Sequence, residues 1–381
     1  MKRIALLLVC VLAAFTAPAN ARVHVSFDFF FDSLSPYGEW VTAGDYGPVW
    51  HPAGVDGDWT PYSDGYWSYT DAGWTWVSYE DWGGITYHYG RWVRLSDYGW
   101  CWVPDYEWGP AWVSWRRSDD YVGWAPLPPE ARWNRGTGFS TWVDTEFDIG
   151  PAWFRFCRVR DFGAPFIRPV LLPCERNYAI IHQTFNITNI SYRGDRGCAF
   201  NQGPDYAWIA PLTARPVPAL KLVRHTSDIF VPGSRGNVFI NAPRGNTLVV
   251  GAPPELPGVP LAPRANLPVA RAFPATRIDR GWAAPAGGAS LDPIRAAFKQ
   301  QASGATPKSA PARPFQPGLV SVVPTKADLR ARVVQPAPRK VGRDLRSSRE
   351  DAWRKITRAS GCRSRGPGSG NSVCTARAGA D

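Results

Sequence analysis

Carboxylates and tryptophans are interleaved over residues 81–120, a combination found where proteins bind or cleave sugars. Glycosidases place two carboxylates on either side of the bond that they cleave. Indole rings offer large flat apolar faces beside them. The candidate ligand-binding residues are Trp82, Trp108, Trp112, Asp81 and Glu107, and further carboxylates available to a hydrolase are Asp97, Asp105, Asp119 and Asp120.

A repeated pattern in these carboxylates argues against catalysis. Glu107 falls on Asp81 when the chain is shifted by 26 residues, and Asp71 and Asp97 lie in turn sequences. Turns favour aspartate for its local backbone hydrogen bonds, whereas a catalytic residue is needed only once. We therefore predict no catalytic residue and no enzymatic activity. Carbohydrate binding by exposed indoles remains the alternative function.

Other kinds of chemistry have little support in the sequence. The five histidines are far apart and no Cys-x-x-Cys occurs, so we predict no metal site. No Gly-x-Ser-x-Gly motif is present, and no glycine-rich phosphate-binding loop opens a helix. We expect no cofactor and find no specific nucleic-acid-binding motif.

The tryptophans themselves follow a repeat. A shift of 26 residues places Gly73, Trp74, Trp76, Val77, Trp82 and Gly83 on Gly99, Trp100, Trp102, Val103, Trp108 and Gly109. An earlier, weaker copy begins near Gly38. A fixed period of this length indicates supersecondary units that share a core with their neighbours. The sequence predicts three such units, within a repeat domain over residues 36–130.

Each unit has the pattern of a β-hairpin. A strand such as 91–95 (RWVRL) is followed by a turn rich in Ser, Asp and Gly, and then by a second strand. Because side chains alternate along a strand, Trp100 and Trp102 share one face while Cys101 and Val103 share the other. We therefore expect the indoles to serve mainly as core residues. The segment 121–130 (YVGWAPLPPE) is expected to cap the array, since its prolines are poorly suited to a central strand.

These motifs resemble a family of exported bacterial Trp-rich proteins that contain a domain of unknown function, described as having YXWGXW-type repeats. The resemblance is carried by tandem Gly-x-Trp units, the segment 108–115 (WGPAWVSW) and the ending 123–127 (GWAPL), and it extends to about residue 224. It implies an envelope or extracellular protein and supplies no activity.

The two ends of the chain predict export and a charged arm. Residues 1–21 have the basic start, apolar run and Ala19-Asn20-Ala21 site of a signal peptide. No later stretch is long and apolar enough to span a membrane. Residues 22–138 carry 7 basic and 16 acidic side chains, a net charge of −9, whereas residues 231–381 carry 24 and 8, a net charge of +16. The basic end either attracts the acidic head or binds polysaccharide or another anionic envelope component.

The cysteines of an exported chain favour disulfides. We expect the pairs Cys157–Cys174 and Cys362–Cys374, with Cys101 and Cys198 either free or paired together. The pattern alone does not settle the connectivity.

Taken together, the sequence predicts an all-β protein. Its parts are an array of three Trp-rich hairpin repeats, a small β-rich module over 139–224, and a Pro/Ala/Arg-rich, mostly disordered basic tail over 256–381 with a short helix near 290–301. The expected function is a non-enzymatic structural or binding role in the periplasm, envelope or extracellular matrix. The sequence does not indicate the oligomeric state.

Overall fold

The structure is a computed structural model of the chain. It describes residues 26–96, 98–140, 143–195, 197–225 and 242–252, together with 269, 271–273, 277–282, 290–293, 295–296 and 298–299. All of these belong to the unit formed by Met1–Arg332. The predicted signal peptide, the pair Cys362–Cys374 and the end of the basic tail lie outside the described residues.

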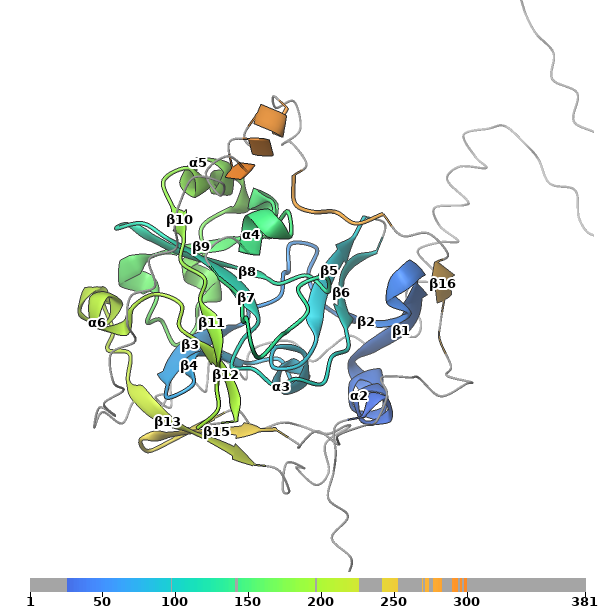
Figure 1. The fold of residues 1–381 in the computed structure, drawn as a ribbon, viewed down its shortest axis with the longest axis horizontal. Coiled ribbons are helices and arrows are strands. Elements are labelled where there is room, and N and C mark those ends of the chain that lie inside the picture. The colour runs from blue at the N-terminus through green and yellow to red at the C-terminus, as the bar shows by residue number, and fades with distance from the viewer. Residues whose placement is uncertain are drawn as a thin grey trace, which may run out of the picture. The chain divides into compact units, whose positions relative to one another are not determined.

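The described residues are mostly β-sheet with few short helices (Figure 1). The helices are α2 (Phe27–Leu34), α3 (Gly83–Thr86), α4 (Val143–Glu146), α5 (Asn177–Ile181) and α6 (Tyr206–Ile209). The strands are β1 (Gly38–Ala43), β2 (Pro48–Pro52), β3 (Gly65–Thr70), β4 (Gly73–Ser78), β5 (Arg91–Leu95), β6 (Gly99–Val103), β7 (Val113–Arg117), β8 (Tyr121–Pro126), β9 (Arg155–Arg158), β10 (Phe185–Asn186), β11 (Ile190–Arg193), β12 (Cys198–Asn201), β13 (Ala219–His225), β14 (Ala242–Arg244), β15 (Thr247–Gly251) and β16 (Arg271–Phe273).

Four hairpins in the first part of the chain share one cross-strand arrangement. In each hairpin a tryptophan of the first strand lies directly opposite a tryptophan of the second. The pairs are Trp40–Trp50 in β1–β2, Trp67–Trp76 in β3–β4, Trp92–Trp102 in β5–β6 and Trp115–Trp124 in β7–β8. Side chains opposite each other on one face interact directly, so each pair fixes the register of its hairpin.

The hairpins are divided among three sheets. β1–β2 and β5–β6 join through β2 and β6 in a five-stranded sheet of order β16-β1-β2-β6-β5. β3–β4 lies in a seven-stranded sheet of order β11-β12-β4-β3-β13-β15-β14, and β7–β8 in a four-stranded sheet of order β10-β7-β8-β9. Successive hairpins therefore do not pair with one another in chain order. The first hairpin pairs with the third.

The segment 121–130 is not the cap that its prolines suggested. Residues Tyr121–Pro126 form β8, which is paired on one side with β7 and on the other with β9. The strand is compatible with proline because Pro126 is its last residue, and Pro128 and Pro129 follow after the pairing has ended. The expectation of a cap was wrong.

Strands from residues 139–224 complete the sheets of the first part of the chain. β9 pairs with β8 and β10 pairs with β7, while β12 pairs with β4 and β13 pairs with β3. Figure 1 shows β13 and β15 below β3 and β4. The sheets thus cross the boundary between the two predicted regions, 36–130 and 139–224.

The five-stranded sheet has two buried faces of different character. Its indole face belongs to the main hydrophobic core and carries Trp40, Trp50, Trp92 and Trp102. Its opposite face forms a second small cluster of Val41, Ala43, Val49, Val93, Leu95 and Cys101. The expected alternation between indoles and smaller residues is therefore present.

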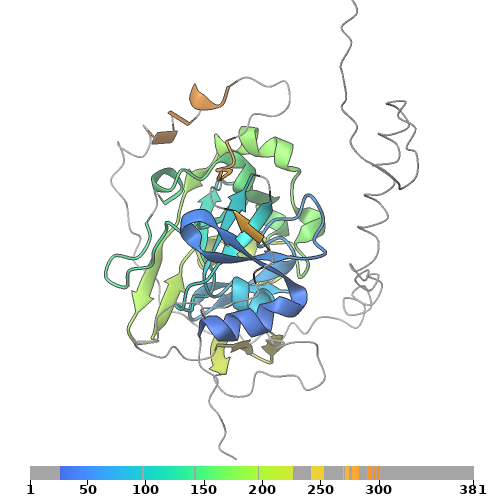
Figure 2. The same ribbon diagram turned by 90° about the vertical axis from the view of Figure 1, so that its right-hand side faces the viewer.

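Part of the segment expected to be mostly disordered packs on the hairpins. β16 runs parallel to β1 (Figure 2), and Ile278 forms a β-bridge with Leu95. Residues 292–293, 295–296 and 298–299 are helical, as the sequence predicted. Arg280 and Arg295, which also lie beyond residue 256, form ion pairs with Glu130 and Asp148.

The predicted Cys157–Cys174 disulfide is not present, since both cysteines are free thiols. Cys157 is fully buried in β9, whereas Cys174 is half-buried and contacts the guanidinium of Arg155. The Arg155 side chain, two residues before Cys157 on the strand, thus lies against the Cys174 sulfur. Cys101 is also a free thiol.

Candidate functional site

The three indoles proposed as a ligand platform are buried. Trp82, Trp108 and Trp112 expose 6%, 4% and 1% of their surface. Trp82 packs against Trp50, with ring centroids 5.2 Å apart, whereas Trp108 stacks on His88. None of the three offers a free ring face to a sugar, so they do not form the exposed platform that the sequence suggested.

The two carboxylates assigned to that platform have separate surroundings. Asp81 is exposed. Glu107 is bound by Arg135, with Nη2 2.7 Å from Oε2, and its side chain is 14% exposed. The ion pair with Arg135 thus accounts for the position of this carboxylate.

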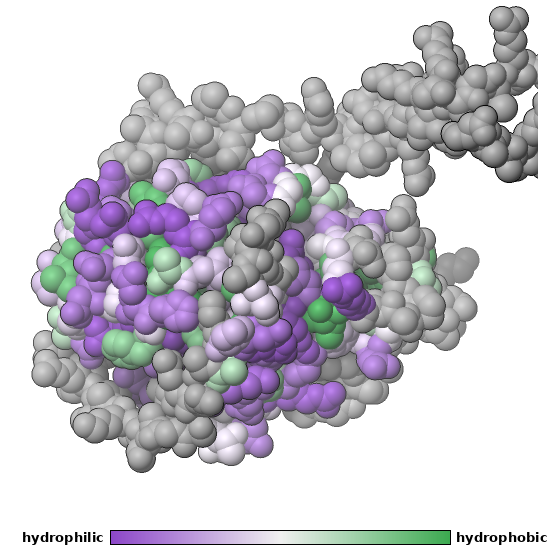
Figure 3. Space-filling view, turned by 90° about the horizontal axis from the view of Figure 1, so that it is seen from above, coloured by the Kyte–Doolittle hydropathy of each residue, from purple (hydrophilic) through white to green (hydrophobic). Residues whose placement is uncertain are grey.

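Burial of indoles is general in the described part of the chain. Fifteen tryptophans are buried there, and Trp133, Trp208 and Trp282 are partly exposed. The large hydrophobic side chains that are clearly exposed are Phe166, Phe185 and Leu212. The face in Figure 3 is accordingly dominated by hydrophilic residues, with hydrophobic ones scattered among them.

A polar cleft lies between the five-stranded sheet and the loop that follows β8. Its volume is about 820 Å³, within the range of small-molecule sites. Its lining mixes acidic, basic and aromatic side chains: Asp45, Tyr46, Arg91, Val103, Pro104, Asp105, Pro129, Glu130, Arg132, Trp133 and Ile278. We call this feature the polar cleft.

Arg91 is the buried cation of the polar cleft. It is the first residue of β5 and is only 3% exposed. Its guanidinium lies 3.9 Å from the ring centroid of Trp112 and donates from Nε to the carbonyl of Ala131 and from Nη1 to that of Gly90. Nη2 has no hydrogen-bond partner in the part of the chain that the structure describes. Burial lowers the pKa of Arg91, and the nearby charge of Asp105 opposes this shift.

Trp133 supplies the partly exposed aromatic surface of the polar cleft. Its ring packs edge-on against Trp112, with centroids 5.0 Å apart, and lies 5.5 Å from the ring of Phe139. These contacts hold the indole in place while part of it stays exposed. Its Nε1 is buried and has no hydrogen-bond partner among the residues that the structure describes.

Glu130 ties the wall of the polar cleft to the C-terminal part of the described chain. One of its oxygens accepts hydrogen bonds from Tyr46 Oη at 2.6 Å and from Arg280 Nη2 at 2.7 Å. Burial disfavours the charged carboxylate, but these two hydrogen bonds outweigh it and hold its pKa below the ordinary value. Glu130 is therefore an ionised anchor for residues 277–282.

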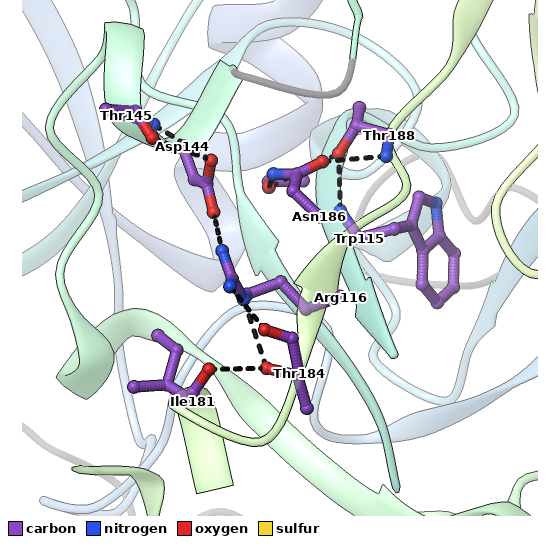
Figure 4. Close-up of polar contacts among 9 residues, drawn as sticks. Trp115, Arg116, Asp144, Thr145, Ile181, Thr184, Asn186 and Thr188 are labelled. Carbon is purple, nitrogen blue, oxygen red and sulfur yellow. Dashed lines mark hydrogen bonds and ion pairs between the residues drawn. The ribbon is translucent and has the colours of Figure 1, made fainter. Parts of the chain in front are cut away.

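A second polar cluster surrounds Arg116 in β7 and is fully satisfied (Figure 4). Arg116 forms a buried ion pair with Asp144, and its Nε and Nη2 donate to the hydroxyl and carbonyl of Thr184 at 3.1 and 2.7 Å. Next to it, Thr188 accepts a hydrogen bond from the backbone of Trp115. This network joins β7 to α4, which carries Asp144, and to the segment that contains Thr184 and Thr188. Its role is structural.

A third cluster contains a buried carboxyl group. Glu80 accepts hydrogen bonds from Trp59 Nε1 at 2.7 Å and Ser78 Oγ at 2.9 Å, and also from Tyr87 Oη at 2.5 Å. Burial raises the pKa of Glu80 to about 8, and the nearby Asp64 adds to this shift. Glu80 is thus largely protonated at neutral pH and holds the turn between β4 and α3.

The sequence did not identify the polar cleft because its residues come from distant segments. Two weak signals were present. Arg91 stands where the other Gly-x-Trp units have Glu39 and Tyr66, and Trp133 lies outside the repeat match. These two features, the arginine at a variable position of the repeat and the tryptophan outside the repeat, were the only signals of the site that the sequence contained.

The comparisons with known proteins find a family similar to the head of the chain, but that family has no known activity. Residues 31–131 match a family of unknown function (DUF6600), a range that covers the four hairpins. No curated protein and no solved structure matches the chain. Among the described residues, none of the helices has both the length and the apolar character needed to cross a membrane.

Proposed function

We propose that the chain is a non-enzymatic structural or binding protein of the bacterial envelope or extracellular matrix, exported by its N-terminal signal sequence. The observation that carries this proposal is the set of four cross-strand tryptophan pairs, whose members are all buried. A repeated Trp-rich hairpin unit thus provides the core of a scaffold. Each indole buries on the order of 150–250 Å², which replaces the Leu and Ile that the head largely lacks.

The surroundings of the carboxylates favour a non-enzymatic role. Glu107 is paired with Arg135, Glu130 is bound by Tyr46 and Arg280, and Glu80 is held by neutral donors inside the core. Each of these groups has a local structural partner. A glycosidase would instead need two carboxyl groups facing one scissile bond across a common site.

The basic end of the chain is proposed as an arm for anionic polysaccharide or another anionic envelope component. Residues 231–381 carry the net charge of +16, and only part of it is used in the ion pairs of Arg280 with Glu130 and of Arg295 with Asp148. Binding that depends on such an arm weakens steeply with salt. Removal of residues 301–381 should therefore abolish the salt-sensitive binding of the protein to anionic polysaccharide or to another anionic envelope component.

Fractionation of cells that express the full chain tests the proposed role. The protein is expected in the periplasmic, envelope or extracellular fraction, and a variant without residues 1–21 is expected to stay in the cytoplasm. The purified protein should leave polysaccharide substrates uncleaved. Cytoplasmic location of the full chain, or turnover of a polysaccharide that is lost on substitution of a described carboxylate, would contradict the proposal.

A further inference from the structure

Two nitrogen donors of the polar cleft have no acceptor among the described residues. They are Nη2 of Arg91 and Nε1 of Trp133, and both residues line the same cleft. An unpaired buried donor costs about 1–3 kcal/mol, so such groups call for an explanation. Both nitrogens are shielded from solvent, and a ligand reaches them only if neighbouring side chains of the cleft shift slightly.

Hydrogen-bond acceptors are present in the same lining. Asp45 is exposed and Asp105 partly exposed, and carboxylate oxygens accept hydrogen bonds only. The cleft therefore offers donors and acceptors together with the partly exposed ring of Trp133. A ligand that matches all three must carry donors, acceptors and an apolar face.

The charges of the lining balance, which favours a neutral ligand. Asp45, Asp105 and Glu130 line the cleft together with Arg91 and Arg132. Glu130 is neutralised by Arg280. Two carboxylates then remain against two guanidinium groups, so a neutral molecule fits the cleft better than a carboxylate- or phosphate-bearing one.

We propose that the polar cleft binds a neutral oligosaccharide. One sugar ring packs against Trp133, oxygens of a neighbouring sugar unit accept hydrogen bonds from Arg91 and Trp133, and hydroxyl groups of the oligosaccharide donate to Asp45 and Asp105. The volume of about 820 Å³ accommodates a short segment of such a chain. This inference rests on the proposed binding role and replaces the buried indoles Trp82, Trp108 and Trp112 as the sugar contact.

Calorimetric titration of the full mature chain tests the proposal. The probes are the neutral hexasaccharides of glucose (β-1,4 and α-1,4 linked) and of N-acetylglucosamine, and the hexamer of galacturonic acid serves as the acidic probe. At least one neutral probe is expected to bind at millimolar concentration or below, and more tightly than the acidic one. Trp133→Ala is expected to weaken this binding at least tenfold, and Asp45→Asn about threefold.

Matched variants separate the cleft from the rest of the molecule. Trp208→Ala removes another partly exposed tryptophan, which lies on α6 and contacts Arg117, and it should leave binding unchanged. If Trp133→Ala fails to fold by circular dichroism, the exposed Asp45→Asn variant still decides the matter, because its side chain makes no core contact to lose.

Three results overturn the proposal. They are an absence of binding to every neutral probe, unchanged affinity in the cleft variants, and tighter binding of the acidic hexamer. In each case, a protein that is still found in the envelope fraction leaves the proposed envelope role intact. Cytoplasmic location with intact sugar binding would instead refute the envelope role alone.

Discussion

At the scale of single residues, the least expected group is the buried carboxyl of Glu80. Of its partners, Trp59 lies in the loop before β3, Ser78 is the last residue of β4 and Tyr87 follows α3. Burial raises its pKa from 4.5 to about 8. Between these two pH values the unfolded chain releases a proton that the folded chain keeps, so the free energy of unfolding falls as pH rises through this window.

Replacement of Glu80 by glutamine should remove this pH dependence. Glu80→Gln keeps the shape of the neutral acid, so the variant should gain stability relative to the wild type at about 1.4 kcal/mol per pH unit between about pH 5 and pH 8. Urea unfolding at four pH values measures the effect. The control is Glu107→Gln, which alters a rim carboxylate paired with Arg135. A constant difference between Glu80→Gln and wild type at all pH values would show that Glu80 ionises normally.

At the scale of elements, the Gly-x-Trp units explain why three of the four hairpins begin at a glycine or directly after one. A Cβ added to Gly90 would lie 2.6 Å from the Trp102 indole and would collide with the carbonyl of Val103. Gly38 and Gly65 meet the indoles of Trp50 and Trp76 in the same way. In these three hairpins the glycine therefore leaves room for the tryptophan of the second strand.

Substitution of that glycine should cost more than backbone strain alone. Gly90→Ala combines an unfavourable φ of +64° with the collision against Trp102, and we expect a loss of about 3 kcal/mol or more in unfolding free energy. Gly47→Ala is the matched control, since its φ is +68° and no atom lies within 4 Å. Its loss should be about 1 kcal/mol. Equal losses in thermal or urea unfolding would refute the steric role of the indole.

Local pattern predicted the hairpins but not their partners. Period-two alternation and Asp/Gly turns identified strands such as β5 and β6, and the repeat identified the indoles as core. The pairing of β2 with β6, and of β8 with β9, depends on contacts across long stretches of chain that no local pattern contains. For the same reason Arg91 and Trp133 could not be assigned to one cleft.

At the scale of the whole described unit, its basic C-terminal part is attached to the acidic head. Arg280 pairs with Glu130, Arg295 with Asp148, and Asp279 with Arg94 of β5. Trp153 Nε1 also donates to the carbonyl of Asp279 at 2.8 Å. Residues 277–295 are thus attached by ion pairs to Glu130 and Arg94 of the head and to Asp148, which follows the head in the chain.

Loss of these ion pairs should destabilise the protein in a salt-dependent way. The double variant Arg280→Ala/Arg295→Ala should lower the unfolding free energy by about 1–2 kcal/mol at low ionic strength and by less in about 1 M salt. Arg168→Ala, which removes an exposed pair with Asp56 elsewhere, should cost less than about 0.5 kcal/mol. Urea unfolding at both salt concentrations measures the difference. A loss that does not change with salt would point to packing in place of charge.

The central claim is that the tryptophans of the hairpins form the core and do not bind ligand directly. Acrylamide quenching of tryptophan fluorescence tests it most directly, because the quencher reaches exposed indoles and not buried ones. The account predicts a blue-shifted native emission of which only a minor fraction is readily quenched, with full quenching after unfolding in urea. Native emission that is quenched as readily as that of the unfolded chain would contradict it.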